Sequence, residues 1–445
     1  MTISQMINAM HGGFLTSAEL VSRYISEIGK NKHLNAVIEL NPNAYAIAEC
    51  RDVADDKRGV LHGIPVLIKD NINTGDRMRT SAGSVALAEN IAPEDAPIVR
   101  LLREAGAVIL GKTNMTEFAN YMTDGTMPNG YSSRGGQTLN LFDREADPSG
   151  SSTGSAVAVA ADLCAAAVGT ETSGSIISPA QHAGIVGIKP TIGLINGGGI
   201  IPISFTLDTP GPMGRCVDDA GLLLSVLTGR KYEKPQETML KGIRIGICRM
   251  FTDGINAEWL NANERLIGVM CELGVDCIEL PEHDIRAGFL YPIAMHEFKY
   301  GINRYLRSMN NPDIPQSLQE IIEYNERHSD IALKYGQDNF VDANNNTSGA
   351  MTEPEYMAAL AARDVAVAAF DTLFVEHRID VFFMLAANSG LAAATGFPSM
   401  TIPIGKTTKG LPIGSFFVAR RYGEKVLLKV TGAIENANKS GSWVM

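Results

Sequence analysis

DPSGSSTGSAVAVAA at residues 147–161 and GTETSGSIISPA at residues 169–180 are the two most informative stretches of this 445-residue chain. Both lie within residues 123–216, where Gly clusters with Ser, Thr and Pro, and this composition predicts that loops dominate there. Residues 155–168 (SAVAVAADLCAAAV) are longer than a typical strand and rich in Ala, which predicts a buried helix.

On both sides of these stretches, apolar strands alternate with amphipathic helices, which is the pattern of an α/β protein whose sheet is covered by helices. A capping box from Thr16 to Glu19 predicts the start of a helix. A second helix is expected at 96–105, strands are expected at 64–68 (IPVLI) and 107–110 (AVIL), and residues 242–280 are expected to form a strand–helix–strand unit. Residues 285–370 are expected to be mainly helical, broken by the polar stretch Asp342 to Gly349, and to cover the sheet rather than form a separate domain.

The composition, with 45% hydrophobic and 20% charged residues, is that of a globular chain. The net charge of −11 argues against binding to nucleic acid or to an anionic membrane, and no apolar run reaches the 18 residues typical of a membrane span. The N-terminus lacks a basic segment followed by a long apolar run, so no secretory signal is expected. The six cysteines are scattered without metal-ligand spacing and are expected to be free thiols. These features predict a cytoplasmic protein without a metal site.

Two short motifs suggest other functions but lack the structural context that those functions need. Residues 106–113 (GAVILGKT) match the phosphate-loop pattern, yet a helix precedes them and AVIL is itself the expected strand. Residues 150–154 (GSSTG) match the nucleophile elbow of α/β-hydrolases with Ser152 as nucleophile, but the polar segment DREADP stands where a buried strand should be. Neither motif is interpreted as functional.

A set of longer segments is more specific. Their order is GIPVLIKDNI at 63–72, TSAGS at 80–84, GKTNMTEFA at 111–119, the two stretches quoted first, KPTIGLI at 189–195, DTPGPMGR at 208–215 and GFPSMTIPIG at 396–405. Together they resemble the amidase signature family of serine hydrolases, and GYSSRGGQT at 130–138 with TETSGS at 170–175 is most similar to its peptide-amidase members. The resemblance implies a twisted mixed β-sheet flanked by α-helices. It also implies one amidase domain over residues 1–445, with a signature core at about 60–220 and a helical cover at about 285–370.

The resemblance further implies a Ser-Ser-Lys triad, with Ser175 as nucleophile, Ser151 as the intermediary serine after a cis peptide bond, and Lys69 as base. A lysine can accept a proton only if burial lowers its pKa, and the apolar residues before Lys69 favour such burial. Without the companion segments, Lys69 would be interpreted as a solvated strand end and Ser151 and Ser152 as helix caps.

Further roles are implied around the triad. The oxyanion hole would consist of the backbone N–H groups of Thr172, Ser173, Gly174 and Ser175. The residues implied to border the acyl pocket are Ala119 and Met122. Asp70 and Glu171 are expected to accept hydrogen bonds from loop backbone.

The predicted reaction is hydrolysis of a small-molecule or peptide carboxamide to a carboxylic acid and ammonia or an amine, through an acyl-Ser175 intermediate and without a metal or organic cofactor. Two departures from the family pattern bear on this: Thr153 replaces a usual Gly, and Ile177 stands where many members carry Arg.

The first alternative is a glutamine-hydrolysing amidotransferase subunit that supplies ammonia to a partner, and Ile177 argues against it. The second is a binding protein that has lost catalysis, against which the presence of all three triad residues argues. The oligomeric state stays open, with a homodimer as one option.

Overall fold

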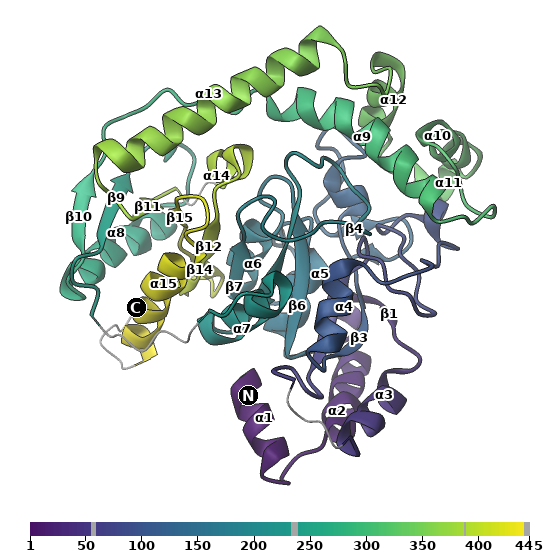
Figure 1. The fold of residues 1–445 in the computed structure, drawn as a ribbon, viewed down its shortest axis with the longest axis horizontal. Helices are drawn as coiled ribbons and strands as arrows, with labels where there is room; N and C mark the ends of the chain where they lie inside the picture. The colour runs from purple at the N-terminus through teal and green to yellow at the C-terminus, as the bar shows by residue number, and fades with distance from the viewer. Residues whose placement is uncertain (55–58, 233–238, 387–388, 440–445) are drawn as a thin grey trace.

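The computed structural model describes residues 1–54, 59–232, 239–386 and 389–439. Within these residues, eleven strands form one mixed sheet (Figure 1). Their order across the sheet is β1 (Val37–Leu40), β3 (Val108–Thr113), β2 (Pro65–Lys69), β6 (Ala166–Glu171), β8 (Thr209–Gly214), β7 (Val186–Lys189), β12 (Ser399–Thr401), β15 (Phe417–Ala419), β11 (Val381–Met384), β9 (Arg244–Cys248) and β10 (Asp276–Glu279). Helices flank the sheet, which confirms the predicted fold class.

The centre of the sheet brings together segments that are far apart in sequence. Strand β2 is parallel to both of its neighbours, β3 and β6, and Ile68 lies opposite Val168. Since parallel strands end at the same edge of a sheet, the residues that follow β2 and β6 must meet there. Lys69 and Glu171 are the last residues of these two strands.

The prediction of one helix over residues 155–168 is wrong in its second half. Helix α5 (Thr153–Ala160) ends shortly before Asp162, whose φ of 52° lies in the left-handed region, and the chain then enters β6. The run Ala166–Val168 forms strand although Ala favours helix, because it pairs with β2 on one side and with β8 on the other.

Residues 290–376 are mainly helical, and in Figure 1 their helices form an arch above the sheet. Its helices are α9 (Leu290–Ser308), α10 (Leu318–Arg327), α11 (Ser329–Ala332), α12 (Asp338–Asn346) and α13 (Pro354–Glu376). The predicted break at Asp342 to Gly349 begins too early, because α12 continues through Asn346. Phe340 holds this helix against α9, where its ring stacks on Phe298 with centroids 5.0 Å apart.

The remaining predicted elements agree with the structure. The capping box is present: the Glu19 backbone N–H donates to the Thr16 hydroxyl at 3.1 Å, and the Glu19 carboxylate accepts from the Thr16 backbone N–H at 2.8 Å. Residues 242–280 form β9, helix α8 (Ala257–Glu272) and β10, with the two strands parallel.

The other helices are α1 (Ile3–His11), α2 (Ser17–Lys30), α3 (Ala44–Asp52), α4 (Pro97–Glu104), α6 (Ile177–Ala183), α7 (Val217–Thr228), α14 (Gly390–Thr395) and α15 (Glu424–Lys439). Two small hairpins pair β4 (Tyr131–Ser132) with β5 (Gly136–Gln137) and β13 (Pro403–Lys406) with β14 (Pro412–Gly414).

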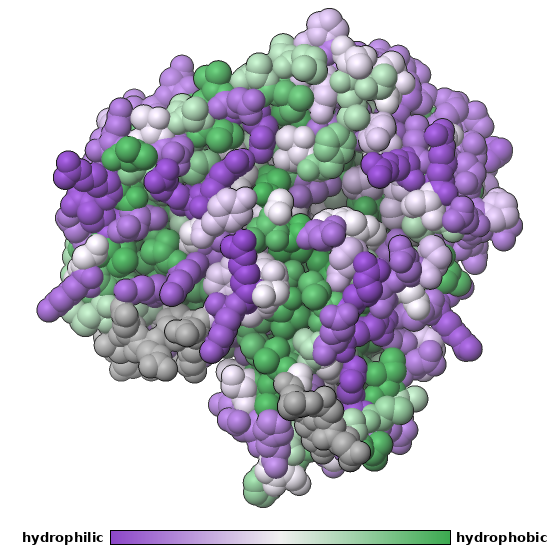
Figure 2. Space-filling view, viewed as in Figure 1, coloured by the Kyte–Doolittle hydropathy of each residue, from purple (hydrophilic) through white to green (hydrophobic). Residues whose placement is uncertain are grey.

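Figure 2 shows hydrophilic residues around the margin of one face and apolar residues nearer its middle. Among the helices that the structure describes, none has both the length and the apolar character that crossing a membrane requires.

Truncation of a core ring tests the packing of the sheet. Phe383 on β11 is fully buried, and its ring lies 5.0 Å from that of Phe417 on the neighbouring strand. We expect Phe383→Ala to lower the free energy of unfolding by about 3–5 kcal/mol, measured by urea titration, because the cavity forfeits both transfer and packing energy. Val365→Ala, at a site that is 70% exposed, is the control and should leave the transition nearly unchanged. Equal shifts in the two variants would contradict the assignment of Phe383 to the core.

Candidate active site

The side chain of Lys69 is fully buried at the end of β2. Its Nζ donates to the hydroxyls of Ser151 at 2.8 Å, Ser152 at 3.0 Å and Thr170 at 2.9 Å. It also lies 3.2 Å from the Thr170 carbonyl oxygen. These partners are all neutral, so hydrogen bonds rather than a direct ion pair hold the amine in the interior.

Burial lowers the pKa of Lys69 to about 7, because the charged ammonium loses its hydration. The carboxylates of Asp208 and Glu171 act in the opposite direction and favour the charged form. A lysine with this pKa is partly neutral at neutral pH, which is the condition for it to act as a base.

Ser151 and Ser152 lie at the start of α5, but Ser152 does not cap that helix through its side chain. Its hydroxyl donates instead to the Thr170 carbonyl at 2.9 Å. The peptide bond from Gly150 to Ser151 is cis, as the family resemblance implied. Thr153, which replaces a usual Gly of the family pattern, donates from its hydroxyl to the Ser149 carbonyl at 2.6 Å.

Ser175 lies in the loop between β6 and α6, beside the serine pair. Its carbonyl accepts a hydrogen bond from the Ser152 backbone N–H at 3.1 Å. The side chain is largely buried, and its hydroxyl has no hydrogen-bond partner among the described residues. Gly174 has a φ of 85°, and a Cβ at this position would lie 2.7 Å from the Ser389 hydroxyl oxygen, so both conformation and space favour Gly before Ser175.

The backbone N–H groups of this loop divide into two sets. Those of Ile176 and Ile177 donate to one oxygen of the Glu171 carboxylate at 2.7 and 3.0 Å, which confirms the predicted hydrogen-bonding role of Glu171. Those from Thr172 to Ser175 donate to no acceptor in the part of the chain that the structure describes. Four consecutive backbone donors beside a serine hydroxyl are chemically suited to bind an oxyanion.

A cavity of about 610 Å³ lies between this loop region and α9. Its polar wall includes Asn71, Thr170, Thr172 and Asp208. The apolar wall includes Ile192, Ile195, Ile201, Ile203 and Phe205, and the side of the cover contributes Tyr300, Arg304 and Tyr305. Ala119 lines the cavity, whereas Met122 is fully buried in the apolar cluster around Phe298, so the structure separates the two residues expected to border the acyl pocket.

Several residues that no sequence motif assigns to the site contact Lys69 or its partners. Ser152 and Thr170 both accept hydrogen bonds from Lys69, and Asn71 donates to the Thr170 hydroxyl at 3.0 Å. Thr170 and Asp208 both lie in segments that carried the family resemblance, which was the available signal. Within the described residues, no three His, Cys, Asp or Glu side chains are grouped so that they could hold a metal ion.

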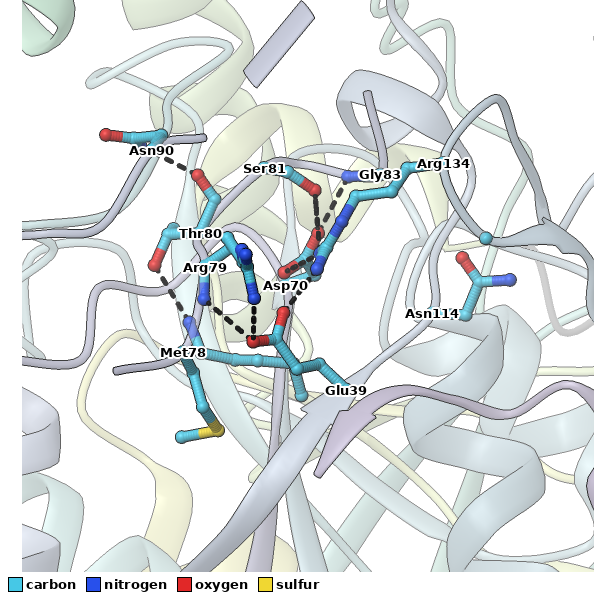
Figure 3. Close-up of polar contacts among 12 residues, drawn as sticks. Glu39, Asp70, Met78, Arg79, Thr80, Ser81, Gly83, Asn90, Asn114 and Arg134 are labelled. Atoms are coloured by element: carbon cyan, nitrogen blue, oxygen red, sulfur yellow. Dashed lines mark hydrogen bonds and ion pairs between the residues drawn. The ribbon is translucent and has the colours of Figure 1, made fainter. Parts of the chain in front are cut away.

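Next to Lys69, Asp70 forms the centre of a second buried polar network (Figure 3). Its carboxylate accepts hydrogen bonds from the Ser81 hydroxyl and from the Gly83 backbone N–H at 3.0 Å, as predicted for loop backbone. Arg134 lies 3.5 Å from the other oxygen and also pairs with Glu39 on β1. Burial raises the pKa of Asp70, and the positive charge of Arg134 opposes that rise. This network holds the loop after β2 and does not contact the Lys69 amine.

The lysine of the phosphate-loop pattern is also structural. Lys112 is fully buried on β3, and its Nζ donates to the Ile72 carbonyl at 2.5 Å and to the Thr80 hydroxyl at 2.9 Å. Residues 108–113 form strand rather than a loop, which agrees with the rejection of a phosphate site.

The chain is similar to known proteins in both sequence and structure. The family model described as Amidase matches residues 19–390. A protein of Arabidopsis thaliana named as a probable amidase is 35% identical over 465 residues, covering 98% of this chain and 90% of that protein. The X-ray structure of native peptide amidase from Stenotrophomonas maltophilia has a TM-score of 0.91 and 35% identity, covering 98% of this chain and 97% of that chain. A glutamyl-tRNA(Gln) amidotransferase subunit of Clostridium acetobutylicum is 30% identical, with 98% of each chain covered.

The chain therefore belongs to the amidase family. Its fold is that of the peptide amidase structure, and it is an amide-hydrolysing enzyme.

Removal of the cation beside Asp70 tests the second network. We expect Arg134→Leu to lower the free energy of unfolding by roughly 3 kcal/mol, because it leaves a buried carboxylate without its ion-pair partner. Arg100→Leu is the matched control, since Arg100 pairs with Glu94 at 3.5 Å on the surface and should contribute less than about 1 kcal/mol. Urea titration of both variants measures the difference, and a control that loses as much stability as Arg134→Leu would contradict the account.

Proposed function

We propose that this enzyme hydrolyses a carboxamide C–N bond through an acyl-Ser175 intermediate, with Ser151 as proton relay and Lys69 as base. The observation that carries the proposal is the fully buried Lys69 amine, 2.8 Å from the Ser151 hydroxyl and with its pKa lowered to about 7. A Ser hydroxyl is a weak nucleophile at neutral pH, and a nearby neutral amine supplies the base that it needs.

In the proposed acylation step, neutral Lys69 accepts the Ser151 proton while Ser151 accepts the proton of Ser175. The Ser175 oxygen then forms a bond to the amide carbon, and the carbonyl oxygen becomes an oxyanion facing the free N–H groups of residues 172–175. Each well-placed donor of this kind can contribute roughly 3–4 kcal/mol to transition-state stabilisation. The proton returns through Ser151 to the leaving nitrogen as the C–N bond breaks, and water attacks the ester by the same route.

The cavity supports an amide substrate with an apolar portion. Its volume of about 610 Å³ is in the range of pockets that enclose a small molecule or a few peptide residues. Because the similar protein from Stenotrophomonas maltophilia is named a peptide amidase, we propose that C-terminally amidated peptides are the first substrates to test. We also propose that residues 1–445 act as one domain, since strands from Val37 to Ala419 belong to the same sheet.

The second candidate is the glutamine-hydrolysing amidotransferase subunit, which the similarity to the Clostridium acetobutylicum protein supports. Ile177 is fully buried in an apolar cluster with Phe382, so this position offers no cation to a glutamine carboxylate. Glutaminase activity together with a stable co-purifying partner would favour this candidate over an amidase that acts alone.

Substitution of the three triad residues tests the mechanism. We expect Ser175→Ala, Ser151→Ala and Lys69→Met each to lower kcat by at least about a thousandfold on an amidated dipeptide, because the three residues act as a unit. A fluorophosphonate probe should label the wild-type protein at Ser175, and Ser175→Ala should not react. Thr352→Ala, at a position outside the cavity lining, is the control for handling and folding. Turnover by Ser175→Ala at the wild-type rate would overturn the mechanism.

The pH dependence follows from the pKa of Lys69. The base must be neutral, so kcat/KM on a non-ionising amide should fall about tenfold per pH unit below pH 7 and level off above it. The carboxylates that face the amine are Asp208, whose pKa burial raises to about 6, and Glu171. Initial rates from pH 5 to 9 measure the profile. A limb centred near pH 10, the ordinary value for lysine, would contradict the role of the buried amine.

A further inference from the structure

Asp208 lies directly across the strand ends from the loop that carries the free N–H groups. Strands β6 and β8 are antiparallel, and Glu171 pairs with Thr209, so the residues just beyond this pair, Thr172 and Asp208, face each other. The Thr172 hydroxyl donates to one oxygen of the Asp208 carboxylate at 2.6 Å. Both residues line the cavity.

The other oxygen of Asp208 holds a different segment. It accepts hydrogen bonds from the backbone N–H groups of Ile203 at 2.8 Å and Ser204 at 2.9 Å. The carboxylate therefore joins the first residue of the oxyanion-hole loop to the segment 203–206, which also lines the cavity.

That segment is held in turn by the cover. Glu297 on α9 is fully buried and accepts a hydrogen bond from the Thr206 backbone N–H at 3.0 Å, as well as from the Ser204 hydroxyl. It also accepts from the Tyr356 hydroxyl on α13 at 2.8 Å. A continuous set of hydrogen bonds thus runs from α13 and α9 through Asp208 to Thr172.

We propose that Asp208 is a positioning residue for amide hydrolysis, which fixes Thr172 and with it the first backbone donor of the oxyanion hole, and which adds a negative charge near Lys69. The inference rests on the proposed function, because it assigns Asp208 a role only if residues 172–175 receive the oxyanion. Asp208 acts through Thr172 and through the electrostatic field at Lys69, and it transfers no proton itself.

The two roles of Asp208 can be separated because Thr172 shares only one of them. Loss of the Thr172 hydroxyl removes the hydrogen bond and leaves the carboxylate in place. Loss of the Asp208 charge removes the anionic acceptor of the Thr172 hydrogen bond. It also removes a negative charge that favours the charged form of Lys69. Three other charged groups lie around these residues and remain in both variants. Glu171 also acts on Lys69, Glu297 lies near Asp208, and Arg304 lines the same cavity.

The experiment measures kcat, KM and the pH profile of Thr172→Val, Thr172→Ser and Asp208→Asn on an amidated dipeptide. Thr172→Val should lower kcat about tenfold to a hundredfold, with KM within about threefold and the acid limb unmoved, because a misplaced oxyanion donor affects the transition state more than substrate binding. Thr172→Ser retains the hydroxyl and should restore most of kcat. Asp208→Asn should lower kcat similarly and also move the acid limb to lower pH, since Lys69 then loses its proton more readily.

Asp253→Asn, at an exposed position before α8, is the charge-matched control and should behave as wild type. If Asp208→Asn fails to fold by circular dichroism, the comparison of Thr172→Val with Thr172→Ser still decides the positioning role. Wild-type kcat in Thr172→Val would overturn the proposal, as would an equal loss in Thr172→Val and Thr172→Ser. Failure of the proposed function is distinguishable, because it would appear as activity and probe labelling that survive Ser175→Ala.

Discussion

A lysine amine that is buried without a direct ion pair is the constraint on which the rest of this site depends. Removing an ammonium group from water is costly, and the structure compensates with neutral hydrogen-bond acceptors from two segments, the serine pair at the start of α5 and Thr170 on β6. Neutral acceptors can bind the amine in either protonation state, whereas a touching carboxylate would fix the charged form. The environment therefore lowers the pKa of Lys69 and still fixes the position of its Nζ.

The sheet topology brings these acceptors together. Because β2 and β6 are parallel neighbours, Lys69 and Thr170 leave the sheet at the same edge, although 101 positions separate them in sequence. The chain between the two strands contains α5, which begins beside that edge with Ser151 and Ser152. A short connection from α5 to β6 returns the chain to the sheet next to β2. The Ala-rich sequence of this region had predicted a continued helix there.

Local patterns in the sequence were sufficient for the elements whose stability is local, such as the capped helix at Thr16 and the apolar strand that ends at Lys69. They failed where neighbours in space decide the outcome. Ala166–Val168 has the composition of a helix and forms strand because β2 and β8 pair with it. The contacts of Lys69 with Ser152 and Thr170 cross between elements, so no spacing within one segment predicts them. The triad positions themselves came from the family resemblance, and burial of Lys69 is the part that the residues alone could favour.

The carboxylates around the site affect Lys69 through their charge without contacting its amine. Glu171 and Asp208 are near enough to affect the pKa of Lys69, yet neither forms a hydrogen bond with it, and each is instead occupied by loop backbone donors. Asp70, the residue next to Lys69 in sequence, is turned to Arg134 and the Ser81 loop. If one of these carboxylates contacted the amine, the gain in electrostatic energy would raise the pKa of Lys69 and reduce its neutral fraction. Holding the anions in backbone hydrogen bonds thus serves two purposes: it shapes the loop that presents residues 172–175, and it keeps negative charge at a distance where it moderates the effect of burial without cancelling it.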